Sequence, residues 1–154
     1  MISLEEIADE LIQTVEQART ELLGIDEAGF RFRPTPDRWS IAQVVGHLVD
    51  SATNNHQRFI RGQLVEELVF PGYQQNEWAE LNAYHDADQR ELVELFYLYN
   101  VQLSRVIRKM EPSHLPTRCT IAPYDPCTLE FLVEDYLVHL KHHLVKIRER
   151  ISEA

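Results

Sequence analysis

The stretch Asp135-Tyr-Leu-Val-His139-Leu-Lys-His142-His143-Leu-Val-Lys-Ile147 has histidines where an amphipathic helix would have leucines. Positions three or four apart share one face of a helix, and that face carries Leu132, Tyr136, His139, His143 and Ile147. Two imidazoles one turn apart can direct ring nitrogens at a single point, as the paired histidines of helical zinc motifs do. The stretch therefore predicts a buried helix that supplies two metal ligands. The alternative is a pair of core histidines, which would need buried partners for their polar nitrogens.

Three further amphipathic segments precede this helix. The first begins at Ser3 and ends at Gly24, the second begins at Ser40, and the third begins near Asp86. In all three, Glu or Gln follows the capping residue three positions later, as in a capping box, and Thr128 caps the last helix. Four helices of about 20 to 25 residues with long connections predict an all-α four-helix bundle with long crossover connections. We expect one domain spanning residues 1–154, without internal repeats.

Three connecting segments separate the helices. Residues 24–38 contain two prolines, so an extended connection is expected there. Residues 62–85 form a long connection for which short helical turns are expected, and residues 112–127 form a second irregular segment. The first of these two long segments carries side chains that could line a pocket or merely cover the core, namely Tyr73, Trp78, Tyr84 and His85.

His47, on the second helix, is the expected third ligand. It lies about two turns into that helix, whereas His139 and His143 lie three to four turns into theirs, so the depths agree if both helices start at nearby ends. Three imidazoles without a carboxylate leave at least one coordination position open, as in catalytic sites. Such a donor set suits Zn²⁺ or Ni²⁺ and could take Fe²⁺ or Co²⁺. Water at the open position would support hydrolysis, and a thiol there would become a strong nucleophile.

A polar line follows one edge of the second helix, comprising His47, Asp50, Ser51, Asn54 and Arg58. Asp50 could orient an imidazole or act as a base. Asn54 and Arg58, with Tyr136 from the last helix, are candidate pocket residues for a substrate or cofactor. The alternative is that Asp50, Asn54 and Arg58 are ordinary solvated residues at the edge of the apolar face.

Other polar residues near the ligand pair have simpler explanations. Asp135 could orient a ligand or be solvated, and His142 is rotated by about 100° from His143, which favours an outer position. Surface or loop positions are expected for His56, His85 and His114. Cys119 and Cys127 are expected to be free thiols, because their spacing fits no CxxC or zinc-ribbon pattern.

Composition excludes several classes of function. The formal net charge of −10 disfavours nucleic-acid binding, and no apolar run is long enough for a membrane span. The acidic N-terminal sequence differs from a signal peptide. We therefore expect a soluble cytoplasmic protein that acts on a small molecule.

The chain resembles the DinB/YfiT-like superfamily in three stretches that occur in the expected order. These are Arg33-Pro-Thr-Pro-Asp-Arg-Trp39-Ser-Ile-Ala-Gln-Val-Val-Gly-His47-Leu-Val-Asp50, Phe70-Pro-Gly-Tyr73, and Thr128 to His143 with its His-x-x-x-His pair. The resemblance implies a four-helix bundle with crossover connections, a nickel or zinc site at His47, His139 and His143, and a homodimer. It also implies a metal-dependent hydrolase or a transferase that uses low-molecular-weight thiols such as bacillithiol or mycothiol.

Three functions are compatible with these observations. The first is a thiol S-transferase in which the ion activates a low-molecular-weight thiol. The second is a hydrolase in which metal-activated water attacks a small amide or ester. The third is a non-catalytic metal-binding module that responds to stress. The three differ in what occupies the open coordination position.

Overall fold

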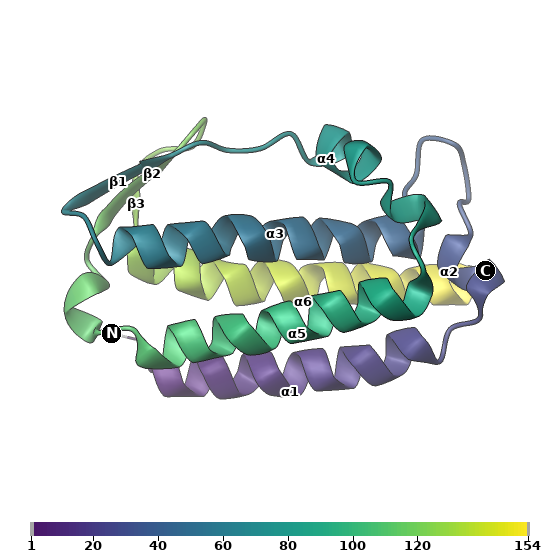
Figure 1. Ribbon diagram of the computed structural model, residues 1–154, viewed down its shortest axis with the longest axis horizontal. Helices are drawn as coiled ribbons and strands as arrows, with labels where there is room; N and C mark the ends of the chain where they lie inside the picture. The colour runs from purple at the N-terminus through teal and green to yellow at the C-terminus, as the bar shows by residue number, and fades with distance from the viewer. Residues whose placement is uncertain (1, 154) are drawn as a thin grey trace.

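The computed structural model describes residues 2–153, and four long helices lie side by side along its length (Figure 1). They are α1 (Leu4–Leu23), α3 (Ile41–Gly62), α5 (Gln89–Lys109) and α6 (Leu129–Glu153). The predicted all-α four-helix bundle is therefore confirmed. None of the helices within residues 2–153 is long and apolar enough to cross a membrane.

The direction of the helices differs from a plain up-and-down bundle. Helices α1 and α6 run one way and α3 and α5 the other, so a single long crossover connects α3 to α5 (Figure 1). This crossover runs back along α3 from one end of the bundle to the other. Helices α3 and α6 are antiparallel neighbours, so they begin at opposite ends of the bundle. The expectation that they begin at nearby ends is therefore wrong. His47 lies near the start of α3, and the histidine pair reaches it because it lies around the middle of α6.

Most of the predicted helix caps are present. The side chains of Ser3, Ser40 and Thr128 each accept a hydrogen bond from the backbone amide three residues later, and Ser40 forms a complete capping box with Gln43. The predicted capping box of Asp86 with Gln89 is wrong, because Asp88 caps α5, two residues after the expected start. The side chain of Gln89 instead donates to the carbonyl groups of Leu22 and Ile25, which ties α5 to the end of α1.

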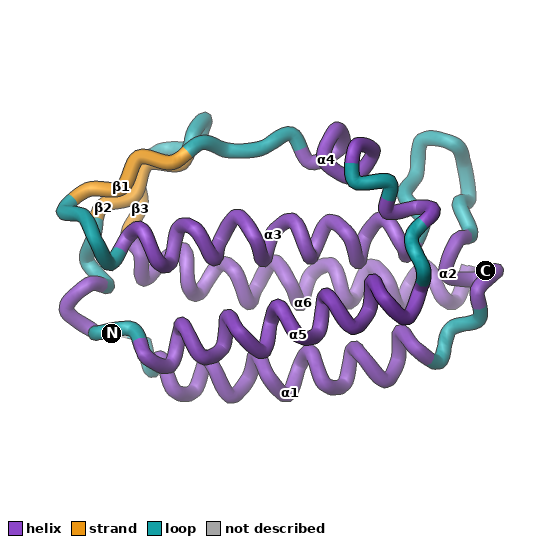
Figure 2. The backbone as a smooth tube through the Cα atoms, in the orientation of Figure 1, coloured by secondary structure: helices purple, strands orange, loops and turns teal. Residues whose placement is uncertain are grey.

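The connections contain short elements, only some of which were expected from the sequence (Figure 2). The segment expected to be extended includes the short helix α2 (Glu27–Arg31), which Asp26 caps before the prolines begin. The crossover carries the helical turns α4 (Gln75–Leu81) and η1 (Tyr84–Asp86), as expected, and another turn, η2 (Pro112–His114), follows α5.

A three-stranded sheet covers one end of the bundle (Figure 2). Strand β1 (Glu67–Phe70) pairs in parallel with β2 (Arg118–Ile121), which pairs antiparallel with β3 (Cys127–Thr128). Cys119 and Cys127 occupy paired positions across β2 and β3, and both are free cysteines. The sheet anchors the crossover to the segment before α6, so two distant parts of the chain form one wall beside α3.

Gly46 permits the close approach of the crossover to α3. A Cβ atom at this position would lie 2.1 Å from two ring carbons of Tyr84, well inside van der Waals contact. Tyr84 belongs to η1 and is buried against the bundle. Residue 46 lies within a regular helix, so its backbone conformation does not need glycine. Glycine is required here because there is no space for a side chain.

We predict that Gly46→Ala lowers the free energy of unfolding by about 1–3 kcal/mol, because the added methyl group must displace the Tyr84 ring. Gly24→Ala is the matched control, since its Cβ would meet only carbonyl oxygens at 3.4 and 3.5 Å and its φ is −81°. The control should change stability by no more than about 0.5 kcal/mol. Urea unfolding of both variants checks this, and equal losses would contradict it.

Candidate metal centre

Three histidine rings converge between α3 and α6. The Nε2 atom of His139 lies 3.3 Å from Nε2 of His47 and 3.1 Å from Nε2 of His143. One ring nitrogen of each histidine lies within 4.8 Å of the other two. His47 is buried and the other two rings are partly buried. The structure thus brings together the three residues that the sequence selected as metal ligands.

The donor set fits a cation better than it fits a hydrogen-bonded core. The Nε2 atom of His139 has one hydrogen or one lone pair, so it cannot satisfy both neighbouring Nε2 atoms. Within residues 2–153, His47 Nδ1 is also a buried atom without a hydrogen-bond partner. A cation would accept a lone pair from each Nε2 and remove the conflict. The three residues therefore fit a divalent metal ion.

The rings favour the neutral state that metal binding requires. Burial, with the charges of His143 and His139, lowers the pKa of His47 to about 3. Burial and the charges of neighbouring His139, His142 and Lys146 lower the pKa of His143 to about 4. Burial also lowers the pKa of His139, against the opposing influence of Asp135. Metal uptake near neutral pH would therefore displace few protons.

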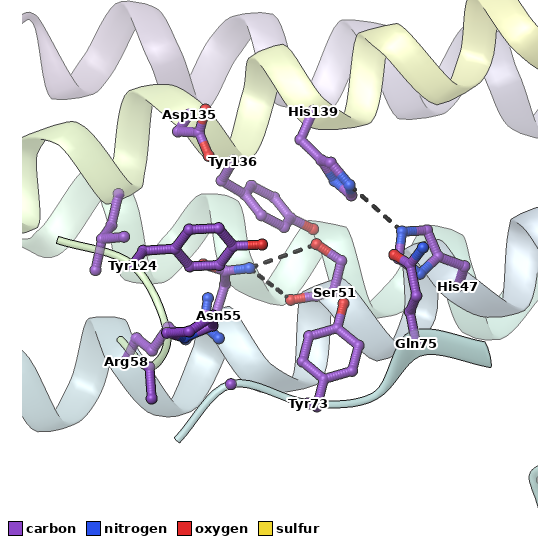
Figure 3. Close-up of a pocket in the computed structure, with 14 residues that line it drawn as sticks. His47, Ser51, Asn55, Arg58, Tyr73, Gln75, Tyr124, Asp135, Tyr136 and His139 are labelled. Atoms are coloured by element: carbon purple, nitrogen blue, oxygen red, sulfur yellow. Dashed lines mark hydrogen bonds between the residues drawn. The ribbon is translucent and has the colours of Figure 1, made fainter. Parts of the chain in front are cut away.

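A cavity of about 210 Å³ lies beside the histidines (Figure 3). Helices α3 and α6 form two sides, and the crossover and the loop between β2 and β3 form the others. Polar and aromatic side chains line most of it, namely His47, Ser51, Asn55, Arg58, Tyr73, Gln75, Tyr124, Asp135, Tyr136 and His139. His47 and His139 lie at one end of this cavity in the view and Arg58 lies at the other, whereas His143 is not among the lining residues.

The candidate pocket residues fall into two groups. Arg58 and Tyr136 line the cavity, and the Tyr136 hydroxyl donates to Asn100 in α5. Asn54, which we expected to line it as well, does not do so: it is buried, and its Nδ2 donates to the Asp50 carbonyl at 2.9 Å. Asn55 lines the cavity in its place, because the cavity lies on the side of α3 that faces α6.

Asp50 faces the crossover. Its Oδ1 accepts hydrogen bonds from the Tyr84 hydroxyl at 2.6 Å and from Asn82 Nδ2 at 3.4 Å. Burial raises the pKa of the Asp50 carboxyl group, although the bond from Tyr84 opposes this. Its Oδ2 is buried without a hydrogen-bond partner in residues 2–153, and Asp50 does not line the cavity. The geometry therefore favours a role in holding the crossover over a role as a base.

Some lining residues could not be identified from sequence patterns. Gln75 begins the short helix α4 and Tyr124 lies in the loop between β2 and β3, and both reach the cavity only after the chain has folded. Of the four crossover side chains considered, Tyr73 lines the cavity, whereas Trp78, Tyr84 and His85 do not. Tyr84 is buried in the core, which fits the alternative that it covers the bundle.

The remaining histidines have other surroundings. His142 is exposed, as expected from its rotation away from the pair. His56 Nδ1 lies 2.8 Å from the Tyr99 hydroxyl, and His85 Nδ1 lies 2.9 Å from the Ser40 hydroxyl. These two imidazoles are satisfied by ordinary partners, in contrast to the three that converge.

Comparisons with known proteins agree with the fold and the family. Residues 4–147 match the sequence model of the DinB superfamily. YfiT from Bacillus subtilis superposes with a TM-score of 0.83 at 23% identity, covering 99% of this chain and 90% of YfiT. That protein is described as a probable metal-dependent hydrolase with an unusual four-helix bundle topology.

Two curated relatives come from other Bacillus species. A Bacillus mycoides protein is 28% identical over 155 residues, which cover 96% of this chain and 89% of the relative. A Bacillus cereus protein is 35% identical over 81 residues, which cover 50% of this chain and 47% of that protein. Both carry the provisional name of metal-dependent hydrolase.

Removing one of the converging histidines should abolish tight zinc binding. We expect His47→Ala and His143→Ala to weaken the affinity for Zn²⁺ by at least about 100-fold, because only two nitrogen donors remain. His142→Ala removes an exposed neighbour and should bind as the wild type does. Calorimetric titration of metal-free, untagged protein measures this. Equal affinity in all four proteins would exclude the site.

Asp50→Asn should stabilise the protein at neutral pH. The pKa of Asp50 is higher in the folded state than in the unfolded chain. As the pH rises, the unfolded chain therefore ionises first, and the folded state becomes less stable relative to it. The amide can still accept from Tyr84 without carrying a charge. We expect a gain of about 1 kcal/mol or more at pH 7 that shrinks towards pH 4. Thermal unfolding at the two pH values tests this, and a loss at pH 7 would contradict it.

Proposed function

We propose that this chain, which belongs to the DinB superfamily, is a metal-dependent hydrolase of small esters or amides. The observation that carries the proposal is the convergence of three neutral imidazole nitrogens beside a cavity lined with polar groups. The names of the Bacillus relatives support hydrolysis over the alternatives.

The proposed ligands are His47, His139 and His143, and the ion is Zn²⁺ or Ni²⁺, because imidazole donors suit these ions. When bound, such an ion supplies a Lewis acid that activates a nucleophile and polarises a carbonyl group. The burial of the three rings keeps them deprotonated, and their packing fixes where the reacting group must lie.

Asp135 is the proposed proton acceptor. It is the one carboxylate among the cavity-lining residues of the described chain, and it lies one turn before His139 on α6. An exposed carboxylate can take a proton from an attacking water molecule and release it to solvent. Asp50, which was the first candidate for this role, has its carboxylate directed to Tyr84 and Asn82 instead.

Aromatic side chains near the cavity orient the His47 ring. Tyr73 packs near His47, with 6.5 Å between ring centroids, and also lies 5.1 Å from the Trp78 ring by the same measure. Trp39, which does not line the cavity, also packs against His47, at 5.3 Å between ring centroids. These rings hold His47 in place and limit the access of water to the reacting group.

Thiol transfer, which was the first function considered from the sequence, becomes the second candidate here, because the same site could accept a low-molecular-weight thiol and the sequence resemblance includes such enzymes. The two reactions differ in whether turnover requires added thiol. The homodimer and the cytoplasmic location also stay predictions, as does the choice between zinc and nickel.

Hydrolysis of a panel of small aryl esters and anilides by zinc-loaded protein tests the proposal. We expect turnover without thiol that disappears in His143→Ala and falls by about 100-fold or more in Asp135→Asn, through loss of the proton acceptor. Glu134→Gln is the matched control, since it removes the same charge from the neighbouring exposed position and should retain activity.

The outcomes separate the candidates. Turnover that needs a thiol would replace hydrolysis by S-transfer, and bound zinc without turnover in either assay would favour a non-catalytic module. Equal rates in the metal-free and zinc-loaded proteins would contradict both enzymatic functions.

A further inference from the structure

Arg58 is a cation in the cavity without a counter-ion. The ion pairs of residues 2–153 occupy most of the other arginines, for example Arg19 with Glu94 and Arg148 with Glu21, but none includes Arg58. Its Nε atom is buried and has no hydrogen-bond partner. The guanidinium carbon lies 5.7 Å from the centroid of the Phe70 ring, a contact that leaves its N–H groups free to bind other partners.

The groups around Arg58 do not supply a negative charge. Its ionisable neighbours include Tyr73, Cys119 and Cys127. Burial raises the pKa of Tyr73 to about 12 and that of Cys119 to about 11, and it also raises the pKa of Cys127. All three are therefore neutral at pH 7. Arginine itself does not lose its proton in proteins, so a partly buried positive charge remains unbalanced.

We propose that Arg58 binds an oxyanion on the substrate, a carboxylate or a phosphate, at the end of the cavity opposite the histidines. The guanidinium group offers a planar fork of donors that matches either oxyanion. The identification of this ligand as a substrate rests on the proposed hydrolase function. The binding of an oxyanion at Arg58 does not, because it depends on the unbalanced charge alone.

The placement of Arg58 limits the substrate class. Arg58 and His47 lie on the same helix, eleven residues or about 16 Å of helix axis apart, and both side chains line the cavity between them. Ser51 and Asn55 occupy the intervening turns and give this stretch a polar floor (Figure 3). The cavity, at about 210 Å³, is below the usual range for drug-sized ligands. The substrate class is thus a short molecule with a scissile ester or amide at one end and an oxyanion at the other.

The second charged side chain of the cavity does not neutralise Arg58. Asp135 raises the pKa of His139 and is absent from the groups that influence Arg58. Arg58 therefore keeps its unbalanced charge although a carboxylate lines the same cavity.

Binding of simple anions tests this proposal without any assay of activity. The probes are butyrate, methyl phosphate and the uncharged isostere butyramide, each titrated into metal-free and zinc-loaded protein while the side-chain Nε–H signals of arginine are followed by NMR. We expect the Arg58 signal to shift with one or both anions in both forms of the protein, and not to shift with butyramide. The relative affinities of butyrate and methyl phosphate identify the oxyanion.

Two variants make the test specific. Arg58→Gln should weaken the affinity for anions by about tenfold or more, because a charge-assisted hydrogen bond is lost. Arg61→Gln removes the same charge from an exposed position one turn later, where the side chain donates to Gln57, and should bind anions as the wild type does. Arg58→Gln should also keep or raise the melting temperature, because an unpaired buried charge is removed.

The outcomes distinguish this proposal from the hydrolase. Anion binding at Arg58 without turnover of any ester would retain the site and refute the hydrolase. Where turnover occurs, Arg58→Gln should raise KM about tenfold for esters that carry a carboxylate and leave KM for neutral esters unchanged. Anion binding that is equal in wild type and Arg58→Gln, or a fall in melting temperature that marks Arg58 as a structural residue, would overturn the proposal.

Discussion

The burial of three imidazole rings between two antiparallel helices is the constraint on which the site depends. Helices α3 and α6 pack so that His47 meets His139 and His143, and within residues 2–153 the buried Nδ1 atom of His47 has no hydrogen-bond partner. A core with such a defect is costly unless a ligand satisfies it. The same burial keeps the imidazoles neutral, so their nitrogen lone pairs are available to bind a cation.

The connections turn this helix pair into a cavity. The crossover passes along α3 and is held there by the contact of Tyr84 with Gly46 and by the bond from Tyr84 to Asp50. The small sheet joins the crossover to the segment before α6, which brings the β2–β3 loop to the opposite rim. The long connections are therefore part of the site, and the four helices alone would leave the histidines on an open groove.

Patterns that repeat along the sequence were sufficient to predict much of this arrangement. Helical periodicity and capping residues predicted the four helices, and the four-residue spacing of His139 and His143 predicted a ligand pair. The small sheet was missed, because its strands have only four, four and two residues and because β1 and β2 pair across 51 positions, from Glu67 to Arg118. The expectation that Asn54 lines the cavity failed for a different reason, since it depended on the exact rotation of α3 against α6, which only packing determines.

The site as a whole joins a neutral donor set, one nearby carboxylate and one distant cation in a cavity built from four parts of the chain. Anomalous diffraction from a crystal of zinc-loaded protein tests its central feature most directly. We predict one zinc peak, about 2.0–2.1 Å from a ring nitrogen of His47, His139 and His143, with at least one further position facing the cavity. A zinc ion bound elsewhere, or one enclosed entirely by protein ligands, would contradict an open three-histidine centre.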